Sequence, residues 1–279
     1  MKKRRLIILA ALFAICSTGS AWGGVYQWFG AELVDGTGRT TEWTSGGAWM
    51  DEFQVGVHGV VPTAADKAKV NLVWGNAGPI ISSQVAVGEI IISEDPAQPA
   101  LQTVTVAAGG SLVTGGGIYP GQLNIGYYVG NTGEFIMDGG TATITENLRL
   151  GWAGKGILQM NGGTLNTNQM FGIGWNGGTG EVHLDGGLLH SAQWWGSTSW
   201  LDTHNYTFDI SGGTWEILGW WEAELNLLKD DGWITGYGNS DNVVIAWDPD
   251  REITTVTAIP EPITLSLLGL GALLLRRRS

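Results

Sequence analysis

The sequence predicts an all-β protein built as a parallel β-helix, a solenoid whose coils stack on one another. One observation is a repeat of about 24 residues: segments 133–140, 156–163 and 180–187 align closely, and a weaker copy follows at 206–213. Another is the alternation of apolar and polar residues in each copy, typical of a strand with one buried face. A Gly-Gly pair ends every copy and predicts a tight corner.

Alignment of the copies places like residues in columns that we expect to stack inside the solenoid. The first column is Phe135, Leu158, Val182 and Phe208; the second is Met137, Met160, Leu184 and Ile210; the third, beyond the corner, is Ala142, Leu165, Leu189 and Trp215. The residues between the first two columns are mostly polar and should face outward. Residues 103–110 resemble an earlier copy with one extra residue.

Other repeat architectures fit less well. A β-propeller blade needs about 40–45 residues, nearly twice this period. Leucine-rich repeats have a compatible length, but their Leu/Asn pattern is absent. A β-sandwich stays open for the less regular N-terminal part.

The repeats, placed at 69–215, need a cap at each end because an open solenoid exposes core and unpaired backbone. Residues 22–68 are irregular and aromatic, and predict an N-terminal cap. The first strands are expected at 70–74, 85–92 and 104–106. Residues 216–258 break the repeat and predict a C-terminal cap, with a short helix at 222–229 and closing strands near 234, 243–246 and 254–257.

Residues 1–21 have the order of a secretory signal peptide. A basic start at 2–5 precedes an apolar run at 6–15, and Gly19 and Ala21 are placed for cleavage by signal peptidase before Trp22. Cys16 is the only cysteine of the chain and lies in this segment. After cleavage the protein would contain no disulfide and no cysteine-based site.

The C-terminal segment, 259–279, is the most specific motif in the chain. Pro260, Glu261 and Pro262 precede an apolar run at 263–275, and Arg276, Arg277 and Arg278 follow it. Thirteen residues span roughly 20 Å as a helix, less than the ~30 Å hydrocarbon core, but the arginines favour a membrane segment with a cytoplasmic end.

This segment closely resembles the PEP-CTERM sorting signal of Gram-negative bacteria in its three parts and their order. The resemblance implies a C-terminal transmembrane sorting helix, recognition by an exosortase-type membrane protease, and a transient stay in the inner membrane before transfer to the cell surface or release. In that family the sorting system accompanies exopolysaccharide production. The Gly-Gly repeats also resemble those of autotransporter-like β-helical passenger domains, which implies a right-handed coil.

The region between the two terminal segments is strongly acidic. Four basic residues belong to the signal peptide and three follow the apolar run of the tail, so between Trp22 and Pro262 there are 7 basic residues against 26 acidic ones, a net charge of about −19. A nucleic-acid partner would require the opposite charge. We therefore expect no nucleic-acid binding.

Fifteen tryptophans make aromatic contact with a carbohydrate a candidate function. Tyr127, Trp152 and Trp175 each follow a Gly at one repeat position and predict an aromatic ladder, with Trp200 near the next position. This ladder has two interpretations, stacking within the scaffold or a platform for sugar. Trp194 and Trp195 are adjacent, so one of them should point outward. The candidate carbohydrate contacts are Trp152, Trp175, Trp194 and Trp195.

No catalytic constellation is predicted from the charged residues of the repeats. Asp138 and Asp185 are corner residues separated by Asn161, which is typical of turn structure. Arg149 and Lys155 are the basic residues of the regular repeats, and neither has an evident acidic partner in the sequence.

No metal site or cofactor is predicted either. The four histidines show no metal-ligand spacing, although His183 and His190 flank one corner.

Three functions remain open. The first is a non-enzymatic, exported structural or adhesive protein of the cell surface or extracellular matrix. The second is a carbohydrate-binding protein that uses exposed tryptophans, with an exopolysaccharide as partner. The third is a polysaccharide lyase or hydrolase, supported by analogy of fold alone.

Overall fold

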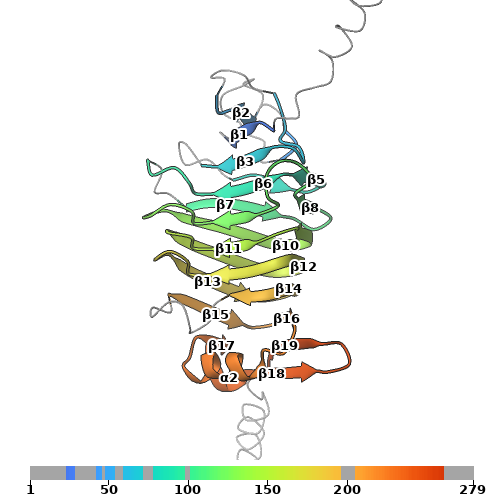
Figure 1. Ribbon diagram of the computed structural model, residues 1–279, viewed down its shortest axis with the longest axis vertical. Helices are drawn as coiled ribbons and strands as arrows, with labels where there is room; N and C mark the ends of the chain where they lie inside the picture. Colours follow the sequence, from blue (N-terminus) through green and yellow to red (C-terminus); the bar gives the residue numbers. More distant parts are fainter. Residues whose placement is uncertain are drawn as a thin grey trace, which may run out of the picture.

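A computed structural model describes residues 23–28, 42–45, 48–53, 59–71, 78–97, 101–195 and 205–260. The described chain is mostly β and forms a β-solenoid of about six turns, whose coils stack along the long axis (Figure 1). The stack keeps the order of the sequence, with β1 (Val25–Trp28) near one end and β19 (Ile253–Ala258) at the other. The predicted parallel pairing is confirmed, because successive coils pair in parallel register from β1 to β17 (Ile234–Gly236).

Each regular coil contributes three strand positions, which form three parallel columns along the solenoid. The first column is β4 (Ile80–Ile81), β7 (Leu101–Val106), the start of β10 (Thr132–Ile144), the start of β12 (Lys155–Ile173), β13 (Thr179–Leu184), β15 (Tyr206–Ile210) and β17. The second is β5 (Gln84–Val87), β8 (Ser111–Thr114), the end of β10, the middle of β12, the start of β14 (Leu188–Trp195) and β16 (Thr214–Leu218). The third is β1, β3 (Lys67–Val70), β6 (Glu89–Ile92), β9 (Leu123–Ile125), β11 (Leu148–Leu150) and the ends of β12 and β14.

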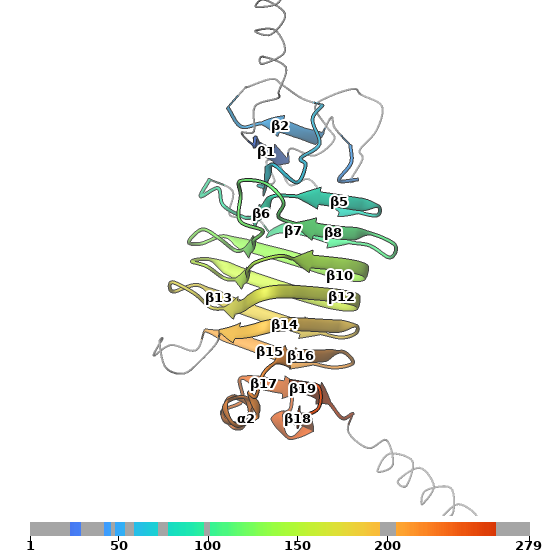
Figure 2. The ribbon, with the colours of Figure 1, turned by 45° about the vertical axis from the view of Figure 1, so that its right-hand side comes forward.

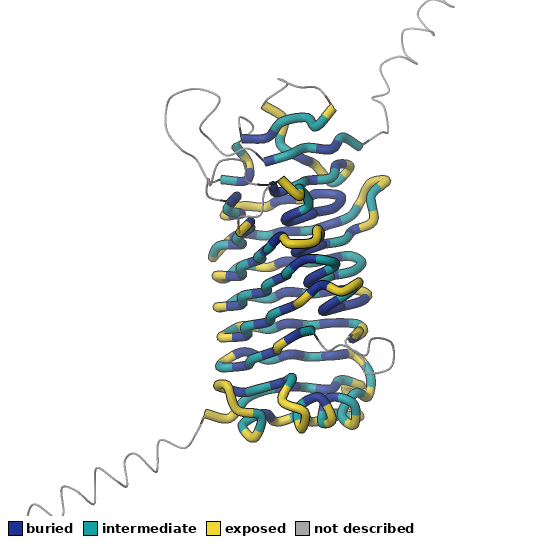
Figure 3. The backbone as a smooth tube through the Cα atoms, turned by 90° about the vertical axis from the view of Figure 1, so that its left-hand side faces the viewer, coloured by how far each residue is buried: buried dark blue, intermediate teal, exposed yellow. Residues whose placement is uncertain are grey.

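The predicted core columns are confirmed. Phe135 pairs with Leu158, and Leu158 with Val182, all of them fully buried. The third predicted column is buried as well, from Ala142 to Trp215. Buried residues alternate with more exposed ones along the coils, as Figure 3 shows. Burial of a large apolar side chain contributes about 1.5–3 kcal/mol, so stacking these columns supplies the main driving force for the fold.

The corners are compact turns between the first and second columns. In the coil that contains β10, the register with β12 shifts between Met137 and Thr141, and Gly139 and Gly140 have positive φ values of 151° and 64°. A Cβ atom on Gly140 would lie 2.3 Å from the carbonyl oxygen of Gly110. The Gly-Gly pair is thus required both by the backbone conformation and by the close approach of neighbouring coils.

The N-terminal region differs in part from its prediction as an irregular cap. Trp28, Trp43 and Trp49 are fully buried against one another, with ring centroids 5.1 Å apart for Trp28 and Trp49 and 4.6 Å for Trp43 and Trp49. However, β1 already pairs in parallel with β3, and β2 (Trp49–Asp51) pairs with β1 in antiparallel orientation. Parallel stacking therefore starts before residue 69, with β3 at Lys67–Val70, and residues 72–74 of the strand expected at 70–74 lie outside the described residues.

The C-terminal cap contains the helix and closing strands that the sequence predicts. Helix α2 (Glu222–Asp230) buries Leu225 and Leu228, and the hairpin of β18 (Val243–Asp248) and β19 lies beside it (Figure 2). A short 3-10 helix, η4 (Ser240–Asn242), leads into β18. β19 pairs with β16 in antiparallel orientation, which ends the parallel stack because no further coil can continue that column.

Candidate functional site

A ladder of four stacked aromatic rings runs along the solenoid. Tyr127 stacks on Trp152 with 6.1 Å between ring centroids and 8° between planes, and Trp152 stacks on Trp175 at 5.5 Å and 11°. Trp195 continues the ladder from Trp175 at 5.4 Å and 24°. Nearly parallel rings at these separations are offset-stacked, so each ring leaves only its edge and part of a face for contact with other molecules.

The backbone positions these rings through the residue that precedes each of the first three. Gly126, Gly151 and Gly174 have φ values of 68°, 67° and 72°, a conformation that turns the chain sharply at the end of the third strand column. The ring of Trp175 then lies over Gly172, because a Cβ atom on that glycine would be 2.9 Å from the Trp175 Nε1 atom. The Trp175 indole fits there because Gly172 has no side chain.

Trp195 enters the ladder from a different position of the repeat. Trp195 pairs with Gly172 of the preceding coil. Because the ring of Trp175 lies over Gly172, the side chain of Trp195 projects next to that ring. The sequence predicts Trp200 as the next ring, and Trp200 lies outside the described residues. The fourth ring of the ladder is Trp195.

The prediction for the pair Trp194 and Trp195 needs a correction. One of the two points outward, as expected, since Trp195 is 46% exposed. Trp194 is 1% exposed and packs in the core against Trp215, with 4.9 Å between centroids. The prediction of a carbohydrate contact at Trp194 is therefore wrong, because alternation along β14 turns this side chain inward.

Arg149 links the ladder to a network of polar side chains at the N-terminal end of the solenoid. Its guanidinium lies 5.0 Å from the centroid of the Trp152 ring and donates a 2.9 Å hydrogen bond to Gln122 Oε1. Burial lowers the pKa of Arg149, while the nearby Glu89, Tyr127 and Glu146 act in the opposite direction. Among the described residues, the guanidinium thus contacts an aromatic face and an amide rather than forming a direct ion pair.

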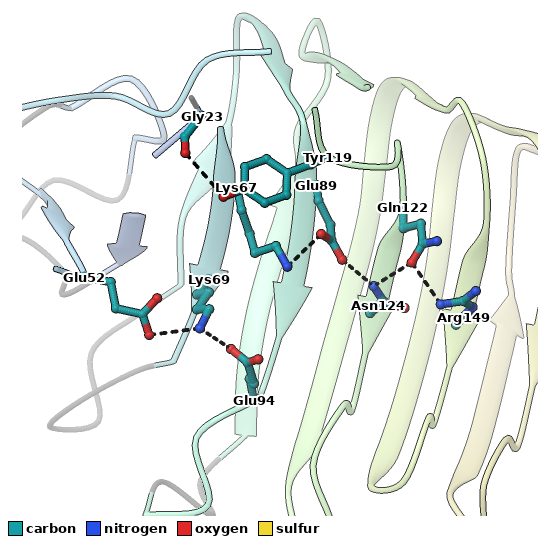
Figure 4. Close-up of polar contacts among 10 residues, drawn as sticks. All are labelled: Gly23, Glu52, Lys67, Lys69, Glu89, Glu94, Tyr119, Gln122, Asn124 and Arg149. Carbon is teal, nitrogen blue, oxygen red and sulfur yellow. Dashed lines mark hydrogen bonds and ion pairs between the residues drawn. The ribbon is translucent and has the colours of Figure 1, made fainter. Parts of the chain in front are cut away.

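The network continues across the coils (Figure 4). Glu89 is almost completely buried and accepts a 3.1 Å hydrogen bond from Asn124, and Lys67 lies 2.9 Å from its other oxygen. The Tyr119 ring lies over the Lys67 ammonium, and its hydroxyl donates a 3.3 Å hydrogen bond to the carbonyl of Gly23. These contacts tie the N-terminal cap to the first coils, which is a structural role.

A shallow groove lies at the Gly-rich turns between the third and first strand columns. It has a volume of about 250 Å³ and is lined by three turns of successive coils, 130–132, 153–155 and 177–179. Each turn follows one of the ladder residues Tyr127, Trp152 and Trp175 by a few positions in the chain. The groove is not among the features predicted from the sequence, although the matching Gly-rich turns after each aromatic residue are a visible signal.

The corner carboxylates form a ladder of their own. The Asn161 side chain donates to Asp138 at 2.6 Å, and the Gln159 amide donates to Asn161 at 2.8 Å and to Asp185 at 2.6 Å. The Ser211 hydroxyl donates to the other oxygen of Asp185. The interpretation of the Asp/Asn corner as turn structure is consistent with these contacts, because Asn161, Gln159 and Ser211 each bind a carboxylate of a neighbouring coil.

Lys155 does have an acidic partner. Its ammonium lies 2.8 Å from Glu181 of the following coil, at an exposed fraction of 39% for the lysine side chain. His183 and His190 lie 3.9 Å and 3.6 Å from the carboxylates of Glu181 and Glu216, respectively. Within the described ranges, no group of three or more His, Cys, Asp or Glu side chains is arranged to hold a metal ion.

The sorting residues lie at and beyond the end of the described chain. Pro260 is exposed and follows shortly after β19, whereas Glu261, Pro262 and Arg276 to Arg278 lie outside the described residues. Among the helices of the described part, none has the length and apolar character needed to cross a membrane.

The fold and the site define the class as a β-solenoid protein with an aromatic ladder along its side. Comparison of the chain with protein-family models, with curated proteins and with solved structures finds no match.

Proposed function

We propose that the protein is an exported structural or adhesive protein of the cell surface or extracellular matrix, without enzymatic activity. The basic and apolar start of the chain, the acidic central region and the repeated coil support this proposal. A stack of parallel coils, which we take to be right-handed as parallel crossovers generally are, provides a long repetitive surface.

The observation that carries the proposal is that the carboxyl groups on the regular coils bind side chains of neighbouring coils. An enzyme could use carboxyl groups such as Asp138, Asp185 and Glu181 for acid–base chemistry if they were directed at a substrate. In the solenoid these three groups are instead bound by Asn161, Gln159 and Lys155, each from a neighbouring coil. The carboxyl groups thus hold one coil to the next.

Export and sorting in this proposal depend on the terminal segments. Signal peptidase removes residues 1–21, and the apolar run at 263–275 holds the chain transiently in the inner membrane. An exosortase-type protease then recognises Pro260, Glu261 and Pro262, with Arg276 to Arg278 on the cytoplasmic side, and the protein passes to the cell surface or the extracellular space. The exposed position of Pro260 shortly after β19 leaves the start of the motif accessible beside the folded part.

Fractionation of the native host tests the sorting step. We expect the full chain in the surface or extracellular fraction, and a chain without residues 260–279 to lose membrane association. A variant with Arg276, Arg277 and Arg278 all replaced by Gln should accumulate at an unprocessed size, since the basic end holds the orientation. Identical distribution and size of all three chains would refute sorting by the tail. Release of reducing or unsaturated ends from a polysaccharide panel would refute the absence of enzymatic activity.

The aromatic ladder supports a second candidate, a carbohydrate-binding protein. Trp152, Trp175 and Trp195 present ring edges and partial faces along the solenoid, and Trp195 is 46% exposed. Aromatic rings beside polar donors are a common way to bind sugars, which have apolar C–H faces and hydroxyl rims. An exopolysaccharide is the partner that this candidate implies.

A further inference from the structure

The described chain ends at Pro260, and two exposed apolar side chains lie beside this point. Ile259 is 58% exposed, and its amide donates a 2.8 Å hydrogen bond to the carbonyl of Asn242. The Asn242 side chain donates a 3.1 Å hydrogen bond to the carbonyl of Gly236. Tyr237, the next residue along the chain, is 43% exposed. These two bonds hold Tyr237 and Ile259 close to the same point of the C-terminal cap, at the lower end of the solenoid in Figure 1.

A third exposed apolar side chain lies on the terminal sheet beside Ile259. β18 and β19 pair Val244 with Thr257, and the bond from Ile259 to Asn242 continues this register. Because side chains alternate along a strand, Val244 and Ile259 lie on the same face of the sheet. Val244 is 38% exposed. Tyr237, Val244 and Ile259 therefore surround the point where the chain leaves the cap, and we call them the exit patch.

The sequence beyond Pro260 places a membrane segment next to the exit patch. In the function proposed above, the apolar run at 263–275 lies in the inner membrane. Ile263 is three residues after Pro260, which is a reach of roughly 11 Å at full extension. The headgroup layer on each side of the hydrocarbon core is about 5–8 Å thick. The cap at Pro260 therefore lies at or in the headgroup layer as long as the run is in the bilayer.

The length of the run and the chemistry of the exit patch both favour close contact. Thirteen apolar residues span roughly 20 Å, less than the ~30 Å core, and a short span draws its flanking residues toward the interface. Tyrosine is enriched at this interface, where the ring leaves water and the hydroxyl stays hydrated. Burial of the Val244 and Ile259 side chains among lipid also removes apolar surface from water.

Charge sets the lipid preference of this contact. Residues 216–260 contain nine acidic and two basic residues, so the C-terminal cap has a net charge of −7. An anionic lipid surface repels this charge, and salt screens the repulsion. We propose that the exit patch contacts the headgroup layer of the bilayer, most strongly where the lipid is zwitterionic, and holds the C-terminal end of the solenoid against the membrane. This inference rests on the proposed stay of the tail in the membrane, and it adds the surface through which the folded part touches lipid.

A fluorophore that responds to polarity tests the contact. The full chain with Cys16→Ser is exported by a bacterial host without an exosortase-type protease and is reconstituted in phosphatidylcholine vesicles. Val244→Cys and Ile259→Cys each place the label in the exit patch. Leu218→Cys is the matched control, because Leu218 is 47% exposed and pairs with Ile253 on the same sheet. Ile253 is six residues from Ile259 along β19, a distance of roughly 20 Å.

The position of the label should decide the response. Emission from Val244→Cys and Ile259→Cys should shift to the blue and rise severalfold on vesicles, and a nitroxide attached to the lipid should quench it, whereas Leu218→Cys should change little. Equal responses at the exit patch and at the control overturn the proposal. A blue shift that the lipid nitroxide does not quench also overturns it, because protein would then cover the patch. Replacement of half of the phosphatidylcholine by phosphatidylglycerol should weaken the response at low salt, and a stronger response would contradict the lipid preference.

Flotation of the same vesicles separates this inference from the proposed function. A full chain that does not float with the vesicles would refute membrane association by the tail, and the contact with it. A chain that floats while the labels in the exit patch respond like the control refutes the contact alone.

Discussion

The ring of Trp195 stacks on the ring of Trp175 from the preceding coil, with 5.4 Å between the centroids and 24° between the planes. The two residues occupy different positions of the repeat, and Gly172 makes their stacking possible because the Trp175 indole lies over it. Each stacked pair of this kind is worth about 0.5–1.5 kcal/mol beyond its buried area. The ladder thus strengthens the stack whether or not it binds a ligand.

Leu158 tests the register of the inner columns. Leu158→Asp should place an unpaired carboxylate between Phe135 and Val182, where all three side chains are fully buried, and lower the free energy of unfolding by more than about 4 kcal/mol. The neighbouring Gln159→Ala should cost about 1 kcal/mol, since it removes only side-chain hydrogen bonds at the surface. Thermal melting measures both. Equal effects would contradict the register.

Glu134 predicts a pH effect on stability. Partial burial raises the pKa of Glu134 above its ordinary value of 4.5, and the nearby His183 opposes this shift. The native state then holds this proton more tightly than the unfolded state, so stability falls as pH rises from 4.5 through the raised pKa. Glu134→Gln should raise the melting temperature at pH 7 and have little effect below pH 4.5.

Glu181→Gln is the control for that experiment, because Glu181 occupies the same repeat position two coils later. It loses the ion pair with Lys155 and should lower the melting temperature at pH 7. A rise for both variants, or a gain for Glu134→Gln that is the same at pH 4 and pH 7, would contradict the assigned cause.

Gly178 and Gly177 lie in one turn but have different structural roles, close packing at Gly178 and a positive φ at Gly177. Gly178→Ala should destabilise the fold by several kcal/mol, because its Cβ atom would lie 2.3 Å from the carbonyl oxygen of Gly151. Gly177 has a φ of 82° and open space around it, and Asn tolerates this conformation. Gly177→Asn should cost less than about 1 kcal/mol. Chemical denaturation distinguishes them, and a larger effect at Gly177 would refute the close packing of these coils.

Glu89 tests the polar network at the N-terminal end. Glu89→Ala leaves Lys67 without the carboxylate 2.9 Å away and removes the nearer acceptor of the Asn124 amide, at a cost of about 3 kcal/mol. Glu94→Ala is the matched control, because Lys69 keeps its 2.9 Å contact with Glu52. That change should cost less than about 1 kcal/mol. Melting curves that do not differ between the two variants would show that the network contributes little.

The regular coils could be predicted from the sequence because alternation and stacking use the same residues. Phe135, Leu158 and Val182 identify an inward column through polarity alone, and the parallel register follows from the constant spacing. The helix in the C-terminal cap also follows from local spacing, at Leu225 and Leu228. In these elements, the apolar residues that define the sequence pattern are the same residues that pack in the core.

The remaining features depend on contacts between residues that no local pattern relates. Trp195 joins the ladder only because Gly172, one coil earlier, has no side chain. Lys155 meets Glu181 diagonally on the next coil, since its direct register partner is Thr179. The parallel stacking of β1 is hidden in the sequence, because β1 and its partner β3 are separated by nearly twice the length of a regular coil.

The register has a consequence for the size of the molecule. Gly133 pairs with Gly156 and Gly156 with Gly180, so segment 133–155 starts and finishes at equivalent points of successive layers. Removing or duplicating this segment would connect one strand start to another in the same direction, and both ends of the protein would keep their contacts. The height of the protein can therefore change through gene duplication or deletion in increments of about 4.8 Å, with no redesign of either end.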